Sequence, residues 1–74
     1  MKGNLNNVQF AISLIRDMAN SGRITRKEIK HRYMKAMEQE ESHSVNATVD
    51  KAIKALTLEG FIERINRGVY IKIN

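Results

Sequence analysis

The feature that most constrains this chain is a change from a helical to an extended pattern at Gly60. Before it, apolar residues recur at three- and four-residue steps, which is typical of an amphipathic helix. After it come two short runs rich in β-branched and aromatic residues, Phe61–Ile65 and Val69–Ile73, joined by Asn66-Arg67-Gly68. A three-residue connection that ends in glycine is typical of a β-hairpin. The sequence therefore predicts a helix followed directly by a hairpin.

Two further helices are predicted upstream. Over about residues 5–20 the apolar positions form one stripe at helical spacing, and a glycine follows as a stop signal. The run Thr25-Arg-Lys-Glu28 is a capping box, which predicts that a second helix of about fourteen residues begins there, after a strand-like pair at residues 23–24. The third helix is expected to take Ser44 or Asn46 as its N-cap.

Length and composition narrow the class of protein. The 74 residues predict one domain over residues 1–74 with a small hydrophobic core. The absence of cysteine excludes disulfides and thiolate metal sites. No apolar run approaches the roughly 20 residues that span a bilayer, and the N-terminus lacks the apolar segment of a signal peptide. We therefore expect a cytoplasmic protein with no membrane partner.

The net charge of +5 is concentrated in one segment. Residues 23–35 hold six lysines or arginines and a single acid, Glu28, so this segment alone carries the whole net charge. A concentrated positive segment indicates a polyanionic partner such as nucleic acid. The alternative is a solvated helix face that only keeps the protein in solution, and charge alone does not separate the two interpretations.

Catalytic chemistry has little support in the sequence. The two histidines, His31 and His43, have no cysteine nucleophile to serve, and the acidic run at residues 38–41 is expected at an exposed helix end. The four glycines are scattered and form no phosphate-binding loop. We therefore expect no catalytic residues, no cofactor, no metal site and no small-molecule effector, and we predict that the chain is not an enzyme.

Four segments together resemble the winged helix-turn-helix family of DNA-binding domains. They are Thr25-x-x-Glu-Ile29, Ser44-Val-Asn-Ala-Thr-Val49, Ala52-Ile-Lys-Ala-Leu56-x-x-x-Gly60-Phe-Ile-Glu-Arg64 and Gly68-Val-Tyr70, within a similarity that covers about residues 8–73. The resemblance implies an α+β, mainly α fold: three helices with a C-terminal two-stranded β-hairpin as the wing. The chain departs from the family in its longer second helix, its extended connection to the third helix and its short wing.

The resemblance implies sequence-specific binding of double-stranded DNA, as a small transcriptional regulator. Helix three (about 44–59) would lie in the major groove, and the 61–73 hairpin wing would lie on the adjacent backbone. The residues that would read bases are Asn46, Ala47, Thr48, Asp50, Lys51 and Lys54. Those that would contact the backbone, from helix two and the wing, are Arg26, Lys27, Lys30, His31, Arg64, Arg67 and Lys72.

The first helix suggests a further interface. Phe10 and Leu14 widen its apolar stripe beyond what a small core needs, so we expect a homodimer seam through Phe10, Leu14 and Met18. An alternative function remains open, because winged helices also serve as protein-protein interaction modules that dock on a larger nucleic-acid machine. In that case Phe10, Leu14 and Leu58 would be exposed apolar anchors.

Overall fold

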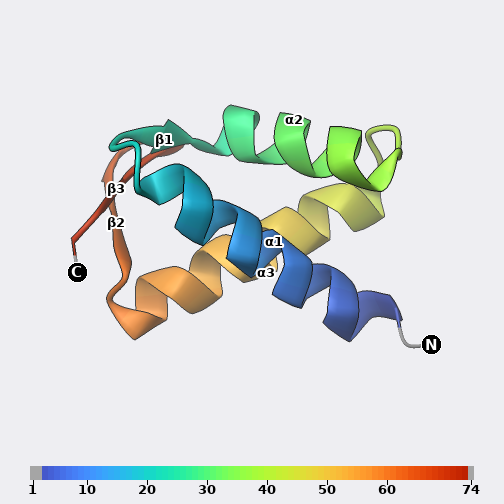
Figure 1. The fold of residues 1–74 in the computed structure, drawn as a ribbon, viewed down its shortest axis with the longest axis horizontal. Helices are drawn as coiled ribbons and strands as arrows, with labels where there is room; N and C mark the ends of the chain where they lie inside the picture. The colour runs from blue at the N-terminus through green and yellow to red at the C-terminus, as the bar shows by residue number, and fades with distance from the viewer. Residues whose placement is uncertain (1–2, 74) are drawn as a thin grey trace.

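The computed structural model describes residues 3–73, with side chains from residue 7 onward. It is mainly helical, with three helices and a three-stranded antiparallel sheet, so the predicted α+β fold class and the winged-helix-like layout are confirmed (Figure 1). Within these residues no helix is long and apolar enough to cross a membrane. The elements in chain order are α1 (Gly3–Ala19), β1 (Ile24–Thr25), α2 (Arg26–Met37), α3 (His43–Glu59), β2 (Ile62–Asn66) and β3 (Val69–Lys72).

The core lies where the three helices meet the base of the hairpin. In Figure 1, α1 crosses α3, while α2 runs along one side of the pair. The predicted inner face of α3 is confirmed, and Ile29 and Tyr33 of α2 face the same core. Ala36 shares the helical spacing of these residues, which predicts that it faces the core, but it is exposed. The buried apolar residues form one cluster: Ala11, Ile15, Met18, Ala19, Ile24, Ile29, Tyr33, Val45, Val49, Ala52, Ile53, Leu56 and Ile62.

The sheet contains one strand more than the predicted hairpin. Its order is β1-β3-β2, and β1 pairs antiparallel with β3, with Ile24 opposite Tyr70 and Thr25 opposite Val69. The hairpin pairs Arg64 with Tyr70 and Asn66 with Val69, which leaves Ile65 as an extra residue in a bulge. Such a bulge twists a strand. The strand-like pair predicted at residues 23–24 is thus shifted by one residue: Ile24–Thr25 form the third strand of the sheet, which attaches the wing to the start of α2.

The helix ends follow local rules, with two corrections. The capping box is confirmed, because the backbone N–H of Glu28 donates to the Thr25 hydroxyl and the Thr25 N–H donates to the Glu28 carboxylate. Gly60 ends α3 in the left-handed region, with φ of 83°. However, α2 has 12 residues and ends where Glu38 takes a left-handed conformation. The N-cap of α3 is Ser42, and not Ser44 or Asn46, because the Ser42 hydroxyl accepts the N–H of Val45.

Two isoleucines of β2 allow a matched test of how the wing is held. Ile62 is buried against the core, whereas Ile65 is 44% exposed. We expect Ile62→Ala to lower the free energy of unfolding by about 2–4 kcal/mol, since it removes buried methyl groups and leaves a cavity. Ile65→Ala should cost about 0.5 kcal/mol or less. Urea unfolding of the two variants measures the difference, and equal losses would mean that Ile62 does not attach the wing to the core.

Candidate nucleic-acid interface

Arg26, the first residue of α2, contacts both the wing and α3. Its backbone N–H donates to the carbonyl oxygen of Gly68 at the wing tip, with a nitrogen–oxygen distance of 2.8 Å. Gly68 has a φ of 68°, a left-handed conformation that favours glycine and turns the chain between β2 and β3. The hydrogen bond extends the β1–β3 pairing by one residue, so the wing tip lies against the first turn of α2.

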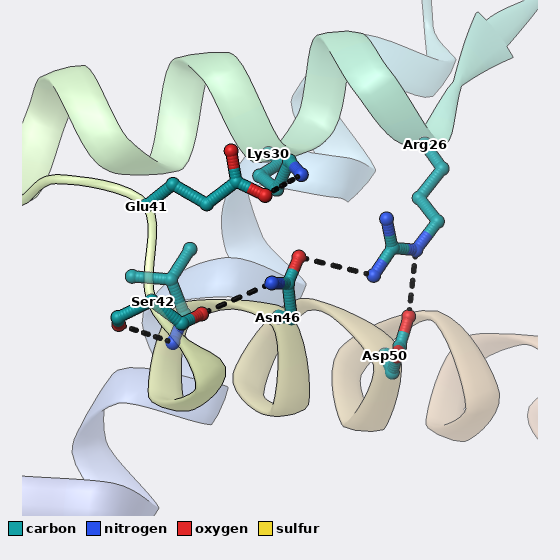
Figure 2. Close-up of polar contacts among 7 residues, drawn as sticks. Arg26, Lys30, Glu41, Ser42, Asn46 and Asp50 are labelled. Atoms are coloured by element: carbon teal, nitrogen blue, oxygen red, sulfur yellow. Dashed lines mark hydrogen bonds and ion pairs between the residues drawn. The ribbon is translucent and has the colours of Figure 1, made fainter.

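The side chain of Arg26 reaches across to α3 (Figure 2). Its Nε donates to Oδ1 of Asp50 at 2.8 Å, and its Nη2 donates to Oδ1 of Asn46 at 3.4 Å. Asn46 is itself held, because its Nδ2 donates to the backbone carbonyl of Ser42 at 3.0 Å. The hydrogen bond to Asp50 raises the pKa of Arg26 above its ordinary value, so the guanidinium stays charged. Three side chains from two helices thus form one polar network.

A second ion pair joins α2 to the connection before α3. The Nζ of Lys30 lies 2.8 Å from Oε2 of Glu41, and Lys30 is the less exposed of the two side chains (Figure 2). The hydrogen bond and charge of Lys30 lower the pKa of the Glu41 carboxyl. Lys30, one cation of the basic segment, therefore holds the connection between α2 and α3 against α2 at Glu41.

Five of the predicted backbone contacts lie together. They line one depression formed by α2 and the wing tip, which also includes Glu41 from the connection before α3. Glu28 and Glu41 are the acids among its lining residues, and Glu41 is paired with Lys30. The basic side chains from the prediction that line it are Arg26, Lys27, Lys30, His31 and Arg67.

The other two predicted backbone contacts, Arg64 and Lys72, do not line this depression. Lys72 has local partners: its Nζ donates to Asn20 at 3.3 Å and lies 5.6 Å from the centre of the Phe61 ring. Arg64 is exposed on β2, opposite Tyr70. The predicted group of basic residues is therefore divided by the fold, and its connected part comes from α2 and the wing tip.

The predicted base-reading residues do not all face solvent. Thr48 is buried, with 9% of its surface exposed, so its assignment as a base contact is wrong. Thr48 and Glu59 are about three helical turns apart, so they lie on the same side of α3. Glu59 pairs with Arg16 of α1, which shows that this side of α3 packs toward α1. Asn46 and Asp50 bond to Arg26. Lys51 and Lys54 are exposed. Ala47, which is closer to the N-terminus of α3, is half-buried.

The predicted dimer-interface residues also differ in their exposure. Phe10 is 39% exposed and its ring lies 6.2 Å from that of Tyr33. Leu14 is partly buried against the core. Met18 is only 9% exposed and belongs to the core, so its assignment to an exposed seam is wrong. The wide apolar stripe of α1 is explained in part by α1 packing against both α3 and α2.

Two further depressions lie next to α1 and adjoin the basic one, because Arg32 lines all three. Both are lined by Leu14 and Arg32; one also contains Arg23, and the other contains Lys35 and Ala36. The basic segment thus extends beyond the basic depression, with Arg23 and Lys35 next to α1, a distribution that a net charge does not reveal. Within residues 3–73 no group of three His, Cys, Asp or Glu side chains is placed to hold a metal ion.

Comparison with known proteins adds no relative. A scan against protein-family models, a search of curated proteins and a search of solved structures each returned no significant match. The functional interpretation of this chain therefore depends on its own residues and their geometry.

The lowered pKa of Glu41 provides a test of the Lys30 pair. A carboxyl with a lowered pKa in the folded state keeps its ion pair at neutral pH and loses it as the pH falls through that pKa. We expect Lys30→Gln to move the pKa of Glu41 upward toward its ordinary value, as followed by NMR of the carboxyl carbon. Lys27→Gln, which removes an exposed cation of the same helix, is the control and should leave the Glu41 pKa nearly unchanged.

Proposed function

We propose that this chain binds double-stranded DNA and acts as a small transcriptional regulator. In this proposal the exposed side of α3 enters the major groove, while the start of α2 and the wing tip contact the sugar-phosphate backbone. The function rests on the arrangement of these surfaces and on no relative of known activity.

One observation carries the proposal: α2, α3 and the wing tip meet at Arg26, next to a surface lined by six basic side chains, because Arg32 joins the five from the prediction. A duplex presents phosphates on both sides of each groove, so a protein that enters a groove needs cations beside the element that enters it. Arg26 connects the basic depression to α3 in this way, through Asp50 and Asn46. Two of its cations, Arg26 and Lys30, are held by side-chain hydrogen bonds, which favours an ordered binding surface over a merely solvated helix face.

Base reading would be limited to a short stretch of α3. Lys51 and Lys54 are exposed and can donate to guanine O6 and N7, whereas Ala47 permits close approach and can contact a thymine methyl group. Thr48 is removed from the predicted set by its burial. With so few base contacts from one chain, we expect modest discrimination by a monomer and a dominant contribution from phosphates.

Duplex binding and base reading can be tested together by fluorescence anisotropy at several salt concentrations. If the five lysines and arginines that line the depression contact phosphates, the slope of log K against log salt should be about −4.5. Arg67→Ala should weaken binding to all sequences alike and make the slope shallower by about 0.9. Lys51→Ala and Lys54→Ala should instead cost more on a selected site than on random duplex. Equal losses on both duplexes for all three variants would contradict base reading by α3.

A second candidate function, docking on a partner protein, is favoured by the depressions between α1 and α2. Leu14 and Ala36 line one of them together with Arg32 and Lys35, and Phe10 of α1 is also exposed. On α3, Leu58 is 79% exposed. These apolar side chains lie outside the basic depression. The two surfaces would adjoin on α2, because His31 and Arg32 line both the basic depression and this one.

Phe10→Ser separates the two functions. Phe10 does not line the basic depression, so a DNA-binding monomer should keep its duplex affinity within about twofold. A docking module that uses this surface should lose its partner in a pull-down. Ile73→Ser removes another exposed apolar side chain, one that is not among the proposed anchors, and serves as the control. Loss of duplex affinity with an unchanged circular dichroism spectrum would contradict the placement of DNA on the α2–α3 side.

The homodimer through α1 remains part of the proposal, with Phe10 and Leu14 as the residues left for a seam once Met18 is assigned to the core. A dimer would double the number of base contacts and could read two half-sites one helical turn apart. Sedimentation of the chain alone and with duplex measures whether such a dimer forms.

A further inference from the structure

Asp50 is an acid on a surface that we propose binds a polyanion. Its side chain is 60% exposed, so burial does not explain it. A free carboxylate there would repel phosphates. The carboxylate is not free, however, because it accepts the Nε–H of Arg26 at 2.8 Å (Figure 2). The contact that Asp50 makes on this surface is therefore with the guanidinium of Arg26.

The hydrogen bonds leave one edge of the Arg26 guanidinium open. A guanidinium carries five N–H donors in a planar fork. The side edge, formed by Nε and Nη2, is directed to Asp50 and Asn46. The end edge, with Nη1 and the second proton of Nη2, has no hydrogen-bond partner within the described residues, and Figure 2 shows Nη1 pointing away from both acceptors. Two parallel N–H groups on one edge match the oxygens of a phosphate.

The surroundings of that edge favour a phosphate over a base. Arg26 begins α2, where the positive end of the helix dipole lies, and Lys27 and Arg67 line the same depression. The exposed side of α3, which would face base edges, carries Lys51 and Lys54 instead. An anion at the Arg26 edge would therefore have two further cations in the surface around it.

We propose that Asp50, together with Asn46, is a positioning residue that holds the Arg26 guanidinium ready for one backbone phosphate of the duplex. This inference rests on the proposed DNA binding. An arginine side chain is long, and binding costs it rotamer freedom unless it is already held. Because the Arg26–Asp50 pair is exposed, it adds little to folding stability, so its loss should affect binding more than folding.

The proposal predicts the sign of a simple substitution. Asp50→Asn removes a negative charge, so if Asp50 only repelled DNA, the variant would bind more tightly. If Asp50 positions Arg26, the variant should bind about 5- to 10-fold more weakly, and its salt slope should become shallower by up to about 0.9. The control is Glu63→Gln, which removes an exposed acid of β2 outside the depression and should tighten binding slightly.

The experiment is anisotropy against a random-sequence 30-base-pair duplex at low and moderate salt, with thermal unfolding to check that each variant folds. Arg26→Lys keeps the charge but loses the fork, and should weaken binding about as much as Asp50→Asn. In an Arg26→Ala background, Asp50→Asn should no longer weaken binding, because the residue that it positions is gone. These three results together support the positioning role.

Two outcomes would overturn it. If Asp50→Asn tightens binding as Glu63→Gln does, Asp50 acts only as a repulsive charge. If the loss in Asp50→Asn is confined to duplexes with particular bases, Arg26 or Asp50 reads a base and the phosphate assignment is wrong. Failure of the wild-type chain to bind any duplex at low salt would instead refute the proposed function itself, which distinguishes that failure from failure of the positioning role alone.

Discussion

The relation of the wing to the helices depends on the antiparallel pairing of β1 with β3. This pairing involves only Ile24 and Thr25, but the hydrogen bond from Arg26 to Gly68 extends it into the first turn of α2. An isolated two-stranded hairpin is marginally stable in water, so the third strand and the burial of Ile62 are what hold the wing. The wing tip therefore lies on α2, and Arg67 lies beside the cations of that helix.

The same junction explains how charge is distributed over the surface. Arg26 pairs with Asp50, and Lys30 pairs with Glu41. Part of the basic segment therefore joins α2 to α3 and to the connection that precedes α3. Exposed ion pairs of this kind contribute little to stability, but they restrict where long side chains lie. The surface proposed for DNA thus combines held cations with more exposed ones such as Lys27. The net charge of this surface therefore overstates the number of its cations that are free to rearrange around phosphates.

Patterns within single elements could be predicted accurately. The inner face of α3, the capping box at Thr25, the glycine at the end of α3 and the hairpin all follow from spacing and local conformational preference. The predicted site was less accurate where a second element decided the outcome. Thr48 and Met18 lie at the edges of their apolar stripes, and packing among the helices buried both. Asn46 and Asp50 point outward on a helical wheel, yet both accept hydrogen bonds from a residue 20 or more positions away.

The sequence by itself determined the three helices, the hairpin and the segment that carries the positive charge, because each depends on interactions between residues close in the chain. Only the tertiary structure decided that this charge lines adjoining depressions along α2, that Ile24 and Thr25 pair with β3 and that Arg26 contacts the wing and α3 at once. The physical reason is that burial and pairing between distant residues depend on how helices cross and in which register strands meet. Neither quantity is encoded in the periodicity of a single element.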